Sequence, residues 1–175
     1  MQRVLASIVL LAVTFFGSYV SSGQAGENYA FLVAVAEYDR TELNPLKFTR
    51  ADIFKFRQSL VDSGFKAENI VLLHDDPAQL KNTRFLALAS NVHDQLALLL
   101  GGLSKDDSLV VGFTGHGIQF EGDKESYFCP RDARLSKKES LVSFADVLKQ
   151  MERCKAGRKL LLVDHLSQDQ QLVHA

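Results

Sequence analysis

One histidine is the strongest candidate for chemistry in this sequence because of the residues that flank it. His116 lies in Gly115-His-Gly117, directly after the apolar stretch at residues 109–113. Such a stretch is typical of a buried parallel strand, and open α/β sheets gather their chemistry beyond the carboxyl ends of these strands. An imidazole there suits general acid–base catalysis, and flanking glycines let the backbone approach a substrate closely. Taken alone, such a tripeptide is more often a turn that carries a surface histidine.

Few other side chains suit a nucleophile or a metal site. The two cysteines, Cys129 and Cys154, form neither a disulfide framework nor a C-x-x-C pair, and whether they pair with each other is left open. Cys129 is expected to be a small buried hydrophobic residue, and Cys154 a packing residue at a helix end. Near the C-terminus, His165, His174 and Asp169 lack a metal-ligand spacing. We therefore predict no metal and no cofactor.

Composition limits the classes of function. The chain has 175 residues, 46% of them hydrophobic and 23% charged, which is typical of one globular domain. Its net charge is −1, and its longest basic block is Lys137-Lys138, so it carries no electrostatic footprint for nucleic acid or an anionic membrane. The loop at residues 37–45 lacks the G-x-G-x-x-G fingerprint of dinucleotide-binding domains.

The N-terminus has the pattern of an export signal. Arg3 precedes an apolar run at residues 4–16, and small residues lead to Gly23-Gln24-Ala25, which is an acceptable cleavage site. The run is shorter than the ~20 residues that span a bilayer, which disfavours the alternative of an uncleaved anchor. We predict a signal peptide at residues 1–25, a secreted or periplasmic mature chain, and no stable membrane span after cleavage.

From residue 29 onward, apolar periodicity predicts strands that alternate with helices. The expected strands are residues 29–36, 69–73, the strand that ends at His116, and residues 158–164; the expected helices are residues 47–63, one from Thr83 to Gly101-Gly102, and one capped by Ser143. A hairpin is expected at residues 118–128, with its turn at Glu121-Gly122-Asp123. This alternation predicts an α/β fold with a mainly parallel sheet covered on both faces.

Six short motifs, in order, extend over most of the chain beyond residue 25. They are Glu37-Tyr38 after the opening strand, Leu46-Lys-Phe-Thr-Arg-Ala-Asp52, Leu72-Leu-His-Asp-Asp76, Phe113-Thr-Gly-His-Gly117, Tyr127-Phe-Cys-Pro-Arg-Asp-Ala133 and Lys159-Leu-Leu-Leu-Val-Asp164. Through this series, residues 29–164 resemble the caspase-like domain of metacaspases and bacterial caspase homologues, which are cysteine endopeptidases. The resemblance implies a caspase-like three-layer α/β/α sandwich.

The resemblance also implies roles for single residues. His116 would be the base of a Cys–His dyad, and Gly117 would donate a backbone N–H to the oxyanion hole. Asp52 and Asp164 would line the pocket for the substrate residue before the scissile bond (P1), so the substrate would be a peptide or protein cut after Arg or Lys. The alternative for Asp52 is an acid favoured by the helix macrodipole in a first turn. For Asp164 it is a residue of a strand-end loop.

The sequence departs from the family at the nucleophile. In the family the last strand continues as Asp-x-Cys, and a caspase cysteine follows its histidine by about 50 residues. Both counts reach position 166, where this chain has Leu166. Leucine offers no nucleophile, so we expect the chain as written to be inactive. Ser167 would need a base suited to a hydroxyl and is not expected to replace the cysteine.

A second departure concerns the C-terminal part. The chain ends eleven residues after Asp164, whereas the caspase-like fold has six main strands. We expect an incomplete, C-terminally truncated caspase-like domain at residues 26–164 and a divergent polar tail at residues 165–175. The fourth strand, at residues 160–163, would lie at a sheet edge, which favours self-association through that strand.

Two functional hypotheses remain open. In the first, the chain derives from a cysteine endopeptidase and departs from it after Asp164 through truncation or a sequence error. In the second, it is a non-catalytic caspase-like pseudoenzyme that binds peptides or proteins. The abrupt change after Asp164, with the motif around His116 intact, favours the first hypothesis.

Overall fold

The computed structural model describes residues 26–165. The predicted signal peptide, at residues 1–25, lies outside the described residues, as do Leu166, Ser167, Asp169 and His174. Within residues 26–165, no helix is long and apolar enough to cross a membrane.

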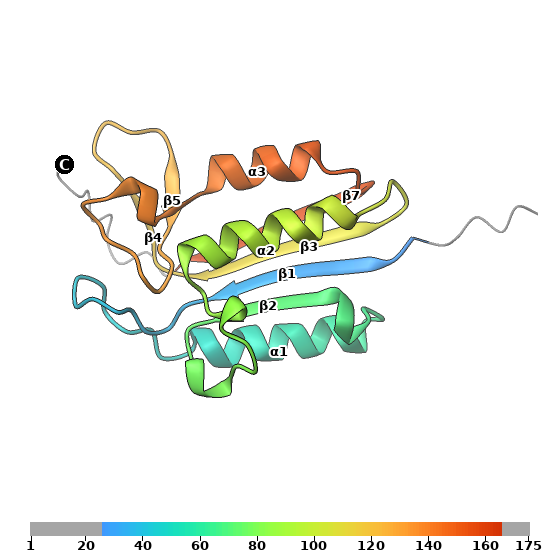
Figure 1. Ribbon diagram of the computed structural model, residues 1–175, viewed down its shortest axis with the longest axis horizontal. Helices are drawn as coiled ribbons and strands as arrows, with labels where there is room; N and C mark the ends of the chain where they lie inside the picture. The colour runs from blue at the N-terminus through green and yellow to red at the C-terminus, as the bar shows by residue number, and fades with distance from the viewer. Residues whose placement is uncertain (1–25, 166–175) are drawn as a thin grey trace, which may run out of the picture.

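A four-stranded parallel sheet forms the centre of the domain (Figure 1). Its strands are β1 (Asn28–Ala34), β2 (Ile70–His74), β3 (Ser108–Gly115) and β7 (Arg158–His165), in the spatial order β2-β1-β3-β7. All three pairings are parallel. The carboxyl ends of the four strands therefore meet at one edge of the sheet, and His116 follows β3 directly at that edge.

Helices cover both faces of this sheet, as predicted (Figure 1). α1 (Thr49–Asp62) packs on one face, and α2 (Ala89–Gly102) and α3 (Phe144–Arg153) pack on the other. Side chains alternate along each strand, so Leu32 of β1 joins the α1 cluster while Phe31 joins the cluster of α2 and α3. The α/β architecture with a mainly parallel sheet is confirmed.

The predicted end of the first helix and the predicted start of the third agree with the structure. Gly64 follows α1 with φ +97°, and its N–H donates to the carbonyl of Val61, as expected of a C′ glycine. The Ser143 hydroxyl accepts the N–H of Asp146 at 3.2 Å and caps α3.

The predicted start of the second helix was wrong. Residues Thr83–Phe85 form a separate short 3₁₀ helix, and α2 begins only at Ala89. Leu86 bridges to His74 in extended conformation, and the Asp132 carboxylate accepts the N–H of Ala89 at 2.9 Å. The start of α2 is thus set by a carboxylate 43 positions away in the sequence. The spacing of apolar residues within the helix carries no information about such a distant partner. The other 3₁₀ helices are Ala67–Asn69, Pro77–Gln79 and Lys138–Ser140.

A small antiparallel sheet lies beside the carboxyl edge of the main sheet. It consists of β4 (Gly117–Gln119), β5 (Ser126–Phe128) and β6 (Val142–Ser143), in that spatial order. The hairpin of β4 and β5 was predicted, and Gly122 takes φ +75° in its turn. β6 was not predicted, because a strand of two residues is too short to show a repeating pattern of apolar and polar residues. This sheet holds the segment that directly follows His116, because β4 begins at Gly117.

Gly115 is required where the main sheet meets the small one. Its φ is +156°, and a Cβ added there would lie 2.9 Å from a ring carbon of Phe128 and 3.2 Å from the Tyr38 hydroxyl oxygen. Real Cβ atoms do not approach a ring carbon so closely. The glycine before His116 therefore serves close packing.

We expect Gly115→Ala to lower the free energy of unfolding by about 1–3 kcal/mol, because the methyl group overpacks a filled site. The matched control is Gly101→Ala, where nothing lies within 4 Å of the added carbon, and where alanine favours the helix. Urea unfolding of both variants measures the difference. Equal stability of the two variants would contradict the packing role of Gly115.

Candidate active site

The His116 imidazole is held by a backbone carbonyl from a distant loop. The residue is 5% exposed, and its Nε2 lies 2.8 Å from the carbonyl oxygen of Asn44, in the loop between β1 and α1 (residues 35–48, the β1–α1 loop). A carbonyl oxygen only accepts hydrogen bonds, so Nε2 must carry the proton. In the neutral imidazole the lone pair is then on Nδ1, which leaves that atom to accept a proton.

Tyr38 holds the backbone of the same histidine. Its hydroxyl oxygen accepts the His116 N–H at 2.9 Å, and its ring lies 5.3 Å from the imidazole ring, centroid to centroid. Burial raises the pKa of Tyr38 above its usual value, so the hydroxyl keeps its proton and donates it to the carbonyl of Val35 at 3.4 Å. Asn44 and Tyr38 belong to one loop, which therefore fixes both the ring and the backbone of His116.

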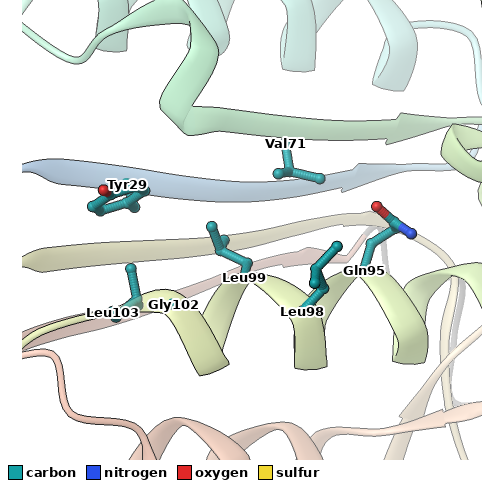
Figure 2. A pocket seen from close by; sticks show the side chains of 7 residues that line it. All are labelled: Tyr29, Val71, Gln95, Leu98, Leu99, Gly102 and Leu103. Carbon is teal, nitrogen blue, oxygen red and sulfur yellow. The ribbon is translucent and has the colours of Figure 1, made fainter.

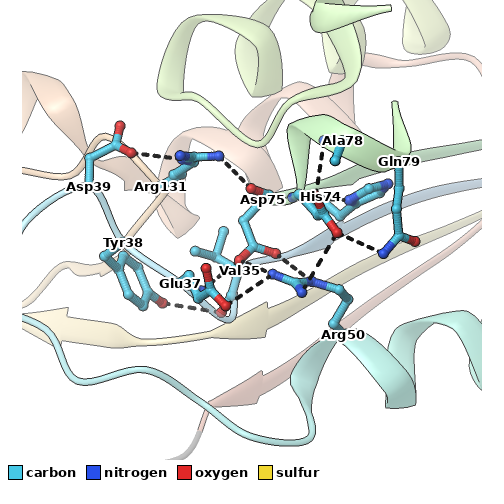
Figure 3. Close-up of polar contacts among 11 residues, drawn as sticks. Val35, Glu37, Tyr38, Asp39, Arg50, His74, Asp75, Ala78, Gln79 and Arg131 are labelled. Atoms are coloured by element: carbon cyan, nitrogen blue, oxygen red, sulfur yellow. Dashed lines mark hydrogen bonds and ion pairs between the residues drawn. The ribbon is translucent and has the colours of Figure 1, made fainter. Parts of the chain in front are cut away.

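A cluster of charged residues around the buried Asp75 anchors the β1–α1 loop (Figure 3). The Asp75 side chain, directly after β2, is fully buried and accepts the N–H of Glu37 at 2.6 Å. It also accepts Nη2 of Arg50 at 2.8 Å and Nε of Arg50 at 3.3 Å, and this bonding raises the pKa of Arg50. Arg131 donates to the carbonyl of Asp75 and, at 2.7 Å, to the carboxylate of Asp39. We call Glu37, Asp39, Arg50, Asp75 and Arg131 the Asp75 network.

Two predicted pocket residues lie on the α1 side of the sheet. Asp164 aligns in register with Thr114 and, through it, with Ala34, which packs in the α1 cluster. The Thr114 hydroxyl lies 3.5 Å from the Asp164 carboxylate, and Asp164 is exposed. Asp52 is in the first turn of α1, is 57% exposed at its side chain, and lies 3.7 Å from the Lys55 ammonium. Its position suits the first-turn alternative, and its pocket role stays a prediction.

Neither cysteine has the surroundings of a nucleophile. Cys129 is fully buried, which raises the pKa of its thiol to about 12, so the reactive thiolate is disfavoured. Its N–H donates to the carbonyl of His116 at 2.9 Å, so it contributes backbone rather than sulfur to the site. Cys154 follows α3, and its carbonyl accepts the Lys159 ammonium at 2.8 Å. Both cysteines are free, and their expected packing roles are confirmed.

Two further features of the described residues lie outside the histidine site. No group of three His, Cys, Asp or Glu side chains within residues 26–165 could hold a metal ion. A groove between α2 and the strands β1 and β2 is mainly apolar (Figure 2) and is lined by Tyr29, Val71, Gln95, Leu98, Leu99, Gly102 and Leu103. It contains none of the predicted site residues.

Gly117, the predicted oxyanion-hole residue, begins β4 opposite Phe128, and its oxyanion role stays a prediction.

Comparison with known proteins agrees with this geometry. The family described as metacaspase, peptidase C14 domain, matches residues 29–163, which is most of the chain. The chain belongs to this metacaspase family. It is 31% identical over 110 residues to Metacaspase-1 of Lodderomyces elongisporus, and 28% identical over 110 residues to Metacaspase-1 of Candida albicans. Each match covers 63% of this chain and 23% of the relative, so the matched segment corresponds to less than a quarter of these relatives' length.

Sequence reasoning found His116 in this metacaspase domain but missed the residues that hold it. Tyr38, Asp75, Arg50 and Arg131 stand within the motifs that carried the resemblance, yet no role was assigned to them. Asn44 contributes only its carbonyl, so its side-chain type gives no signal. A usable signal was present for Asp75, because a charged residue directly after a buried strand must find partners.

We expect Tyr38→Phe to lower the free energy of unfolding by about 1–3 kcal/mol, because the buried His116 N–H loses its acceptor. Tyr29→Phe is the control, since no hydrogen bond of its hydroxyl is found among the described residues. Chemical denaturation of both variants and the parent gives the comparison. The assignment of Tyr38 is wrong if both variants retain the parent's stability.

Proposed function

We propose that this metacaspase domain is built to hydrolyse peptide bonds after Arg or Lys, and that the chain as written is inactive because Leu166 stands at the nucleophile position. The observation that carries the proposal is the 2.8 Å contact of His116 Nε2 with the Asn44 carbonyl, which leaves Nδ1 as the base. Membership of the metacaspase family supports the reaction class. A peptide or protein is accordingly the substrate.

The family reaction would use the residues of this site in a fixed order. With a cysteine at position 166, Nδ1 of His116 takes the thiol proton, and the thiolate attacks the substrate carbonyl carbon. The Gly117 N–H stabilises the oxyanion of the tetrahedral intermediate. The imidazolium then protonates the leaving amine, and a water molecule hydrolyses the thioester. The β3–β7 register supports position 166, because Gly115 pairs with His165, and in the sequence these two residues are followed by His116 and Leu166.

Preference for a basic P1 residue rests on two carboxylates. Asp52 and Asp164 lie on the α1 side of the sheet, and Asp164 is exposed at its carboxyl edge. Arg50, two residues before Asp52, already pairs with Asp75 at 2.8 Å. Its charge is compensated, so it does not oppose a substrate cation.

The direct test restores the nucleophile. We expect the purified parent protein to be silent on fluorogenic Arg and Lys substrates, and Leu166→Cys to be active. Adding His116→Ala to that variant should reduce the rate by about 10²–10⁴-fold, because the general base is removed.

Leu166→Ser is the matched control, because a hydroxyl in this site lacks the low pKa that makes a thiol usable. Activity of the parent that disappears with His116→Ala would refute the assignment of Leu166 as the missing nucleophile. Silence of Leu166→Cys with intact folding would refute the claim that the rest of the site is competent.

A second candidate function is a pseudoenzyme that binds basic peptides. The observation in its favour is that Leu166 coexists with an intact setting for His116. Two measurements separate the candidates: binding of an Arg peptide to the parent protein, and the nucleotide sequence after the Asp164 codon read in three frames. An Asp-x-Cys continuation in another frame would exclude the pseudoenzyme. For either candidate we propose export directed by residues 1–25.

Self-association through β7 is a further part of the proposal. Within the described residues β7 has one neighbour, β3, and Leu160 and Leu162 on its α1 face are 50% and 39% exposed. In a two-fold antiparallel pairing centred on Leu161, Leu160 faces the second copy's Leu162, and Arg158 faces its Asp164. The pairing is complementary in both apolarity and charge, and it would compete with a substrate cation for Asp164.

We expect the parent protein to be dimeric at micromolar concentration and Leu160→Lys to be monomeric, because the substitution places two like charges in the contact. Leu148→Lys on α3 is the control, since Leu148 is similarly exposed at 45%. Light scattering after size-exclusion chromatography measures the masses. A monomeric parent, or a dimer that persists in Leu160→Lys, would contradict the contact.

A further inference from the structure

Asp75 is the most deeply buried member of a network assembled from four separate segments. Its side chain is fully buried, whereas those of Arg50 and Arg131 are 27% and 25% exposed. It joins the end of β2 to α1 through Arg50, to the β1–α1 loop through Glu37, and to residue 131 after β5 through its carbonyl (Figure 3). A buried carboxylate with this many donors holds its partners in one arrangement, because leaving any of them unpaired is costly.

The loop that Asp75 holds is the one that holds His116. Asp75 accepts the Glu37 N–H at 2.6 Å, one residue before Tyr38, whose hydroxyl accepts the His116 N–H. On the other side of Tyr38, the Asp39 carboxylate accepts from Arg131, and the Asp39 N–H donates to the Arg131 carbonyl at 3.0 Å. Tyr38 is therefore clamped between two residues of the Asp75 network.

The same loop closes on itself near Asn44. The Leu46 N–H donates to the carbonyl of Ala36 at 2.8 Å, so the loop's two ends are tied together directly beside Glu37. The Asn44 carbonyl that meets His116 lies within this closed segment. Any shift of Glu37 is thus transmitted to the carbonyl that decides which imidazole nitrogen carries the proton.

We propose that Asp75 is a positioning residue, whose buried carboxylate sets the β1–α1 loop so that the Asn44 carbonyl keeps His116 in the Nε2–H tautomer. Asp75 acts through the loop and touches neither the imidazole nor a substrate. The proposal deepens the function proposed above, since only this tautomer leaves Nδ1 free to take a proton. It supplies the outer layer of support that a catalytic base needs to keep one orientation.

The test reads the tautomer directly and needs no activity. In protein with ¹⁵N-labelled histidine, long-range ¹H–¹⁵N correlation at about pH 8 distinguishes Nε2–H from Nδ1–H, and His116→Gln assigns the signal. The parent should show His116 as the Nε2–H form. In Asp75→Asn the ratio of the two tautomers should shift toward Nδ1–H by roughly fivefold to tenfold, the value of one hydrogen bond.

Asp76→Asn is the matched control, because it neutralises the neighbouring carboxylate, which also lies near Arg50, at 3.9 Å. Asp76 caps the short helix Pro77–Gln79 and contacts no residue of the β1–α1 loop in the described hydrogen bonds. Its replacement should leave the His116 tautomer unchanged. A folded Asp75→Asn with the parent's tautomer, or an equal shift in Asp76→Asn, overturns the proposal.

A second variant covers the case in which Asp75→Asn does not fold. Asp75→Asn with Arg50→Gln removes both charges, so no uncompensated charge is left in the site. Its His116 tautomer should shift in the same direction, and a parent-like tautomer overturns the proposal. In the Leu166→Cys background, Asp75→Asn should lower kcat more than it raises KM. Silence of that background would refute the proposed function while the tautomer measurement still decides the role of Asp75.

Discussion

The buried Asp75 carboxylate is the interaction on which the arrangement around the histidine depends. It directly follows β2, pairs with Arg50 at the start of α1, and accepts the N–H of Glu37 in the β1–α1 loop. An ion in an apolar interior is tolerated only when nearly all of its hydrogen-bonding capacity is used. Here that requirement is met by bringing three segments together at the carboxyl edge of the sheet, and the β1–α1 loop takes its shape from them.

The parallel register explains why the chemistry gathers at this edge. Ala34, Thr114 and Asp164 align across β1, β3 and β7, and β3 and β7 each continue for one more residue, to Gly115 and His165. His116 follows Gly115 directly, held on one side by the loop after β1 and on the other by the small antiparallel sheet. The close contact of Gly115 with Phe128 and Tyr38 joins the two supports, so the imidazole is positioned by packing and by hydrogen bonds together.

The contrast between an intact histidine setting and Leu166 is the central functional question for this metacaspase domain. A site that has lost its function would be expected to lose its buried polar contacts early, because a buried polar group without its hydrogen-bond partner destabilises the fold. The contacts of His116, Tyr38 and Asp75 are complete, and no buried side-chain polar atom in the described residues lacks a partner. The support around His116 is therefore retained in full among the described residues.

The sequence alone determined the elements whose signals are local. The apolar runs of the strands, the helix at residues 47–63 and the Ser143 cap all depend on residues a few positions apart, so periodicity and capping rules predicted them. The resemblance added His116 as the base because the histidine stands in a short recognisable motif. Only the tertiary structure decided what holds it, since Asn44 acts through its carbonyl and Asp75 acts across 38 positions on the N–H of Glu37. Likewise α2 starts where Asp132 reaches its first N–H, and the partner of a buried charge is chosen by the fold rather than by its neighbours in sequence.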